Sequence, residues 1–270
     1  MHKTEMRNER TTYIDRASTT EMLAMIQEEN YNAVRAIEAA MPSIARAVDA
    51  ISERMKEGGR LIYMGAGTSG RLGVMDAAEC PPTYGVSADA VSGIIAGGMD
   101  RMYSAAEGAE DSSEAGTSDI KAKNITKFDT VLGISAAGNA AYVADALEYA
   151  RSVGALTVGL TCNEDSRLGR EPDISIVTDT GAEAITGSTR MKAGSAHKMV
   201  LNMISTAVMV KAGHVYENMM INVRPTNVKL RRRVISIVEE IMHCDEAGAV
   251  EFLEAHGWSI RAVVDSEKKQ

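Results

Sequence analysis

The sequence predicts an α/β protein in which a parallel sheet lies between helices on both faces, as three layers. Two observations predict this class. Short, fully apolar segments alternate with helical segments, and glycine- or serine-rich turns follow several of the apolar segments. Strands that are apolar on both faces are typical of a parallel sheet covered on each side. We expect an N-terminal helical segment over 1–57, the α/β domain over 58–226 and a short helical tail over 227–270.

The N-terminal segment is predicted to form two helices. Ser18 and Glu21 have the spacing of a capping box, and a first helix follows to about Asn30. Apolar residues at helical spacing then predict a second helix that ends near Glu57, where two glycines follow.

Strands and helices alternate through the predicted α/β domain. The expected strands cover 60–65, 90–95, 130–134, 156–160 and 174–177. The expected helices cover 69–79, 101–108, 111–122, 140–153 and 189–212. Two consecutive prolines, Pro81 and Pro82, are expected to stop the helix 69–79.

Composition excludes several classes of function. A formal net charge of −8 argues against a nucleic-acid or anionic-membrane surface. The three cysteines form no C-x-x-C pair and the five histidines show no ligand spacing, so we predict neither a disulfide framework nor a metal site. No secretory signal or membrane-spanning run is recognisable. We therefore expect a cytoplasmic protein.

The turn after the first strand has the composition of a phosphate site. Its glycines, Gly67 among them, allow a tight turn and a close approach of the backbone to a ligand. Thr68 and Ser69 then begin a helix, where free N–H groups and hydroxyls favour an anion. The same letters match G-x-G-x-x-G, but the acidic residue that a dinucleotide site requires at the end of the next strand is missing. NAD binding and a purely structural turn remain the alternatives to a phosphate ester.

Two further turns are predicted at the same edge of the sheet. One contains Ser135 and Asn139, which could bind phosphate or simply start a helix. The other contains Ser188, with Arg190 and Lys192 in the expected first helical turn, where the macrodipole disfavours cations. Such cations indicate a bound anion or a buried carboxylate partner such as Glu183.

Three acidic residues are candidates for acid–base chemistry: Glu79, Glu107 and Glu110. Surface carboxylates are usually only solvated. Two of them at the ligand edge of a parallel sheet could instead serve as an acid and a base.

Long stretches of the sequence resemble the N-acetylmuramic acid 6-phosphate etherases, members of the sugar-isomerase (SIS) domain family. The matching stretches are TEMRN, GRLIYMGAGTSGRLGVMDAAECPPTYG, IIAGG, AAEGAEDS, ITGSTRMKAGSAHKMVLNMIST and GHVYENMMINVRPTN. The resemblance implies a SIS-like fold and a cytoplasmic, dimeric lyase that needs no cofactor. Its implied partner is a small-molecule sugar phosphate, N-acetylmuramate 6-phosphate, which gives D-lactate and N-acetylglucosamine 6-phosphate in cell-wall sugar recycling.

The resemblance also implies roles for the two carboxylates. Glu79, in AAECPP, matches the acid that protonates the departing lactate, and Glu110, in EGAED, matches the base that removes the C2 proton. A carboxylic acid that acts near neutral pH needs a pKa raised by burial or by a like charge. Ser69 and Glu79 are separated by about 15 Å along an ideal helix. This separation is longer than a hexose phosphate, so Ser69 and Glu79 of one chain are not expected to reach the same substrate. We therefore expect a second subunit to complete the site.

The sequence departs from the family pattern in two places. Members usually read S-A-S-G-R-T-P where this chain has Ser135-Ala-Ala-Gly-Asn-Ala-Ala141, and losing these contacts could weaken phosphate binding by roughly a few kcal/mol. The region after Asn227 resembles a reduced form of the family's ubiquitin-associated-like helical domain. A sugar-phosphate-binding regulatory protein and a phosphosugar isomerase of the same fold are the alternatives.

Overall fold

Five parallel strands form a single sheet in the first of two compact units of the chain. The computed structural model describes residues 3–104, 108–223, 225 and 227–267. The first unit combines the residues up to 78 with 89–208, and the second combines 79–88 with the residues from 209 onward. The strands are β1 (Leu61–Gly65), β2 (Val91–Ile95), β3 (Thr130–Ile134), β4 (Leu156–Thr161) and β5 (Ile174–Val177), in the order β2-β1-β3-β4-β5.

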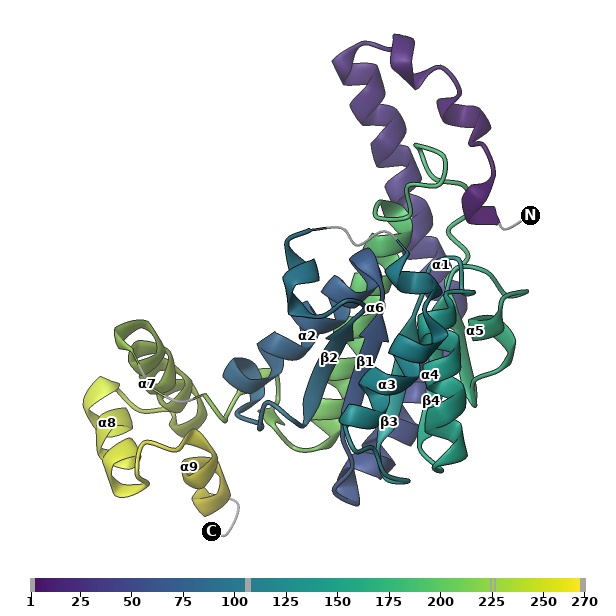
Figure 1. Ribbon diagram of the computed structural model, residues 1–270. Coiled ribbons are helices and arrows are strands. Elements are labelled where there is room, and N and C mark those ends of the chain that lie inside the picture. Colours follow the sequence, from purple (N-terminus) through teal and green to yellow (C-terminus); the bar gives the residue numbers. More distant parts are fainter. Residues whose placement is uncertain (1–2, 105–107, 224, 226, 268–270) are drawn as a thin grey trace. The chain divides into compact units, whose positions relative to one another are not determined.

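Helices cover both faces of this sheet, which confirms the predicted three-layer α/β class (Figure 1). On one face, Val143 and Leu147 of α4 (Ala141–Ser152) share a buried core with Ile62 and Val131. Figure 1 shows α3 (Ser113–Ala122) beside α4 in front of the sheet and α6 (Lys192–Lys211) behind it. Side chains alternate along a strand, so Tyr63, next to Ile62, points to the opposite face.

A buried aspartate ties two helices to that opposite face. The Tyr63 hydroxyl donates to Asp76 Oδ2 of α2 (Gly67–Tyr84) over 2.9 Å. Asp76 Oδ1 accepts hydrogen bonds from Asn202 and Ser205 of α6. This network fixes the positions of α2 and α6 relative to β1, and therefore the place where each helix begins.

The N-terminal segment forms one long helix, so the prediction of two helices was wrong. The capping box between Ser18 and Glu21 is confirmed and starts α1 (Thr19–Lys56). No glycine or proline separates the two predicted segments, and Pro42, further along, lies inside α1. Short 3₁₀ turns precede this helix at Lys3–Glu5, Glu9–Thr11 and Ile14–Arg16.

Pro81 and Pro82 do not stop their helix, which corrects a second prediction. Helix α2 begins at Gly67 and continues through both prolines to Tyr84. Proline has no N–H for the carbonyl four residues earlier, but its φ is helical, so the chain keeps turning. The Gly85 N–H then donates to the Pro81 carbonyl over 2.9 Å.

Several smaller elements differ from their predicted bounds. The helix expected over 101–108 is a 3₁₀ turn, Met99–Met102, and residues 105–107 lie outside the described residues. The 3₁₀ turn Ala109–Asp111 and the cap Ser112 precede α3. A one-turn helix, α5 (Arg167–Arg170), was not predicted. Helix α6 begins three residues later than expected, so Arg190 precedes it and Lys192 is its first residue.

The second unit has a hydrophobic core of its own. It contains α7 (Val228–Met242), α8 (Glu246–Ala255), α9 (Ile260–Glu267) and an antiparallel hairpin, β6 (Val215–Tyr216) with β7 (Met219–Met220). The side chains of Val234, Leu253 and Val263 bring the three helices together. The predicted tail thus contains a cluster of three packed helices.

Candidate active site

The sheet order indicates a ligand site at the carboxyl ends of β1 and β3. These strands are neighbours, but β1 leads through α2 to β2 on one side, whereas β3 leads through α4 to β4 on the other. In open parallel sheets, such a point of divergence is where ligands bind. Thr68 and Ser69 follow β1 and Ser135 follows β3, so the topology brings two of the three predicted loops together.

The first loop is built for close approach of backbone to ligand. A Cβ on Gly65 would lie 2.6 Å from the Gly70 nitrogen, so only glycine permits this turn. Gly67 has a φ of +52° and is the first residue of α2. The first helix-type bond runs from the Gly70 N–H to the carbonyl four residues earlier, so the N–H groups of Gly67, Thr68 and Ser69 precede it. Three N–H groups at a helix start form a site for an anion.

The polar side chains of the second loop hold the loop itself together. Ser135 is buried, and its Oγ accepts the Gly138 N–H over 3.0 Å. Asn139 is exposed, and its Oδ1 accepts the Arg167 N–H over 2.9 Å at the start of α5. The Ser135 hydroxyl can still donate its proton, because it acts here as an acceptor. The loop is therefore held in place by its own side chains, and the Ser135 hydroxyl lies at the carboxyl end of β3.

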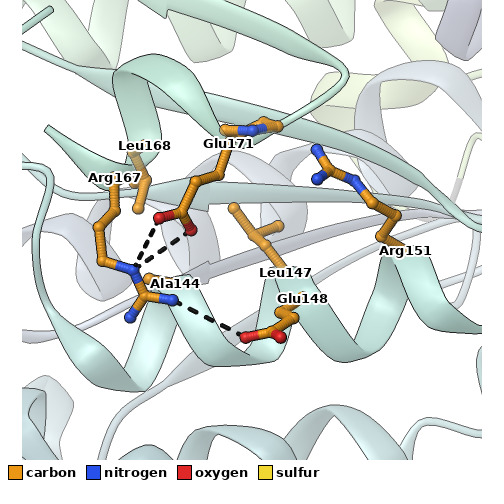
Figure 2. Close-up of a pocket in the computed structure, with 8 residues that line it drawn as sticks. Ala144, Leu147, Glu148, Arg151, Arg167, Leu168 and Glu171 are labelled. Carbon is orange, nitrogen blue, oxygen red and sulfur yellow. Dashed lines mark hydrogen bonds and ion pairs between the residues drawn. The ribbon is translucent and has the colours of Figure 1, made fainter. Parts of the chain in front are cut away.

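The Arg167 guanidinium does not replace the arginine that the family pattern has in this loop. Figure 2 shows it above α4, directed at Glu171 and Glu148 in a cavity of about 260 Å³. It lies 2.7 Å from Asp145 and 3.1 Å from Glu171. Its charge is thus neutralised by carboxylates of α4 and of the residue that follows α5.

The third loop lies beside the first. A Cβ on Gly194, in the first turn of α6, would lie 3.5 Å from the Thr68 methyl group. The starts of α2 and α6 therefore meet at one place. Ser188 is half-buried and Arg190 is exposed in the loop that precedes α6. The structure thus brings Thr68 next to the loop that carries Ser188 and Arg190.

Lys192 has a buried carboxylate partner. Its Nζ donates to Glu29 of α1, and the two side chains are 2% and 3% exposed. Burial alone would raise the pKa of Glu29. The hydrogen bonds from Lys192 and Asn8, together with the positive charges of Lys192 and Arg10, outweigh burial and lower this pKa below its ordinary value. The two charges stabilise each other where neither reaches water.

Glu183 supplies the cap of α6. Its two carboxylate oxygens accept the N–H groups of Lys192 and Ala193 over 3.2 and 3.0 Å. Burial raises its pKa above the ordinary value. The sequence left open a buried carboxylate partner for the cations of this loop, with Glu183 as the example; the structure gives Lys192 the partner Glu29 and puts Glu183 on the backbone N–H groups.

A buried cysteine–histidine pair lies behind this cap. Cys162 Sγ is 3.5 Å from His197 Nε2. Burial raises the pKa of the Cys162 thiol to about 11 and lowers that of the His197 imidazole to about 4. Both groups are neutral at pH 7, so they pack as polar core residues and supply no nucleophile.

The two carboxylates implied by the family motifs lie in different units. Glu110 is exposed in the 3₁₀ turn before α3, in the first unit. Glu79 is exposed on α2 and belongs to the second unit, where it lines a cavity with Arg233 of α7. Glu107, the third candidate, lies outside the described residues. Arg233 was not predicted, because it lies beyond the first turn of α7 and a run of three arginines carries no ligand signal by itself.

Curated relatives cover most of the chain. The N-acetylmuramic acid 6-phosphate etherase of Clostridium beijerinckii is 51% identical over 97% of this chain and 86% of its own length. That of Bacillus subtilis is 56% identical over 88% of this chain and 78% of its own length. The chain belongs to this etherase family. Family models for the SIS domain and the glucokinase regulatory protein N-terminal SIS domain match residues 102–212 and 43–151.

Solved structures of lower identity show the fold. The phosphoheptose isomerases of Francisella tularensis and Neisseria gonorrhoeae superpose with TM-scores of 0.54 at 17% and 16% identity. Each match covers 71% of this chain, and 98% and 99% of those chains. They place this etherase family member in the SIS fold. In the part that the structure describes, no helix has the length and hydropathy to cross a membrane, and no three potential metal ligands cluster.

Proposed function

We propose that the chain is a carbon–oxygen lyase that cleaves the D-lactyl ether of N-acetylmuramate 6-phosphate in cell-wall sugar recycling. The observation that carries this proposal is the high identity to named etherases over nearly the whole chain. The start of α2 after β1 supports it, because a phosphate group fits the N–H groups there. The products are N-acetylglucosamine 6-phosphate and D-lactate, and the reaction needs no cofactor.

The proposed reaction is an elimination followed by addition of water. The sugar ring opens to its aldehyde, which makes the C2 proton acidic, and Glu110 removes that proton. The C3–O bond breaks as Glu79 protonates the ether oxygen, so lactate departs and a C2=C3 double bond forms. Water then adds its hydroxyl to C3 and a proton returns to C2. Each positioned acid or base typically contributes 10²–10⁴-fold to such a step.

The phosphate is assigned to the loops of the first unit. Gly67, Thr68 and Ser69 offer N–H groups and hydroxyls, and Ser135, Asn139 and Ser188 offer further polar atoms. We assign the exposed guanidinium of Arg190 a direct contact with the phosphate. The Lys192 ammonium is held by Glu29, so we assign Lys192 the role of fixing the start of α6 beside this site.

We further propose that the active form is a homodimer. Glu79 and Glu110 are both exposed in the single chain, so substrate or a second chain has to shield them from water during the reaction. Ser69 and Glu79 are also about 15 Å apart along an ideal helix, more than the span of a hexose phosphate. Mixing Glu79→Ala with Ser69→Ala chains tests sharing, since mixed dimers should recover part of the activity that each variant lacks.

The proposed location is the cytoplasm. The three cysteines are free thiols, and Cys80 and Cys162 are buried, as expected of a protein in a reducing compartment. The substrate class supports this, because sugar phosphates are intracellular metabolites.

Release of D-lactate tests the proposed activity. The wild-type chain is incubated with millimolar N-acetylmuramate 6-phosphate, and D-lactate is measured with a coupled dehydrogenase. We expect stoichiometric D-lactate and N-acetylglucosamine 6-phosphate. If no lactate is released, the assignment fails.

One observation favours a regulatory protein as the second candidate. A model of the glucokinase regulatory protein SIS domain matches residues 43–151, and Ala137, Ala140 and Ala141 replace polar or rigid residues of the family's loop. Calorimetry distinguishes the two. Tight binding of a hexose phosphate without release of lactate would support regulation over catalysis.

A further inference from the structure

The second unit contains a cavity of about 630 Å³ that holds Glu79. It is lined by seven residues of the segment 79–87, by Met220 of the hairpin, and by Leu230 and Arg233 of α7. All of them belong to the same compact unit, so the cavity is complete within that unit. It offers one carboxylate, one guanidinium and an apolar wall.

The wall that carries Glu79 is held firmly against the rest of the unit. Gly85 has a φ of +68°, and a Cβ there would lie 2.7 Å from the Asn222 carbonyl oxygen, so the turn after α2 packs directly on Asn222. Asn222 in turn lies 2.6 Å from His214 Nδ1 and accepts a 2.8 Å hydrogen bond from Arg261 Nε of α9. The turn that follows α2 is therefore held to Asn222, and through it to α9, by packing and hydrogen bonds.

Arg233 is placed to bind an anion in this cavity. Three consecutive arginines, residues 231–233, lie in the first half of α7. Arg231 lies over the Trp258 ring, 3.8 Å from its centroid, and so has an internal partner. Arg233 is exposed and has no carboxylate partner among the residues that the structure describes. Glu79 and Arg233 thus share a cavity without neutralising each other.

We propose that Arg233 binds the lactyl carboxylate of the substrate while Glu79 faces the ether oxygen. In a lactyl ether a single carbon separates the ether oxygen from the carboxylate, and that carbon carries a methyl group. A site for the lactyl group therefore requires an acid for the ether oxygen, a separate cation for the carboxylate, and an apolar surface for the methyl group. Pro82, Met220 and Leu230 provide that apolar surface. A guanidinium binds a carboxylate through two parallel hydrogen bonds. The inference rests on the proposed function and gives the helical tail a part in substrate recognition.

The test pairs a change in the protein with a change in the substrate. The two substrates are N-acetylmuramate 6-phosphate and the analogue whose lactyl carboxyl is a neutral primary amide. The variants are Arg233→Gln, Arg233→Lys and the matched control Arg232→Gln, which removes a neighbouring exposed arginine outside the cavity. Lactate or lactamide release gives kcat/KM for each pair.

We expect the wild type and Arg232→Gln to prefer the acid over the amide by about 10- to 100-fold. Arg233→Gln should lose this preference. Arg233→Lys keeps the positive charge but cannot make the two parallel hydrogen bonds, so it should retain part of the preference. A ratio of preferences is insensitive to a general loss of active protein, so partial misfolding does not imitate the result.

Two results would overturn the inference. One is an Arg233→Gln variant that prefers the acid as strongly as the wild type does. The other is a wild type that releases both leaving groups at the same rate. These outcomes leave the proposed function intact, whereas failure of the wild type to cleave either substrate removes the proposed function and the inference with it.

Discussion

Two groups of charged side chains in this chain differ in whether their charges are paired within the protein. At the start of α6, Lys192 pairs with Glu29 and Glu183 accepts two backbone N–H groups, all out of contact with water. In the cavity of the second unit, Glu79 and Arg233 are exposed and form no ion pair with each other. A buried charge must be paired inside the protein, whereas an exposed charge in a cavity can bind a ligand. The first group therefore builds the fold and the second is available for chemistry.

The largest expected effect comes from the proposed catalytic carboxylates. Glu79→Gln and Glu110→Gln should each reduce the rate of lactate release by roughly 10²–10⁴-fold, because each removes a proton donor or acceptor while keeping the side-chain shape. Glu114→Gln, which alters an exposed carboxylate in the first turn of α3, is the matched control and should keep full activity. Equal activity of all three variants would show that neither carboxylate acts as proposed.

The buried pair should respond in stability. Glu29→Met alone leaves the Lys192 ammonium buried without its carboxylate and should cost about 3–5 kcal/mol of the free energy of unfolding. The double variant Glu29→Met/Lys192→Met should recover much of that loss, because no uncompensated charge remains. Urea unfolding followed by far-UV circular dichroism measures both. Strict additivity of the two single changes would contradict the pairing.

The buried imidazole of His197 should make stability depend on pH. Its pKa is about 4 in the folded chain and about 6.5 when unfolded, so the unfolded state binds the proton first. The stability linked to this group is complete above pH 6.5 and falls by about 3 kcal/mol as the pH drops toward 4.

Unfolding free energies at pH 7.5, 5.5 and 4.5 measure this dependence. His197→Gln should flatten it. His243→Asn, at an exposed left-handed position that asparagine tolerates, should leave it unchanged. Identical slopes in the wild type and His197→Gln would contradict the assignment of a buried neutral imidazole.

The smallest expected effect lies in the second loop. Asn139→Ala removes the acceptor for the Arg167 N–H and should lower stability by about 1 kcal/mol, as loss of a helix cap does. Asn139→Asp keeps that oxygen and should keep the stability, while its charge should repel a bound phosphate and raise KM. A KM equal to that of the wild type would place the phosphate away from this residue.

The sequence predicted the sheet better than it predicted the helices. The strands Thr130–Ile134 and Ile174–Val177 were predicted to the residue, because each is a short, largely apolar run bounded by turn residues. Pro81 and Pro82 misled the prediction, since a proline lacks one N–H but has a helical φ, so a helix can continue through it.

For the candidate site, composition found the loops but could not tell a ligand contact from an internal one. The pairing of Lys192 with Glu29 joins residues 163 positions apart, and no local pattern reveals it. Arg233 escaped prediction for a similar reason, because its cavity forms only when residues 79–88 pack against a segment more than a hundred positions later.

The central claim, cleavage of the ether by elimination followed by addition of water, is tested most directly by isotopes. The reaction is run in D₂O and in H₂¹⁸O, and both products are analysed by mass spectrometry and NMR. The account predicts deuterium at C2 and ¹⁸O at C3 of the N-acetylglucosamine 6-phosphate, with no ¹⁸O at the lactate hydroxyl. Lactate that carries ¹⁸O, or a sugar product that keeps its original C2 proton, would contradict it.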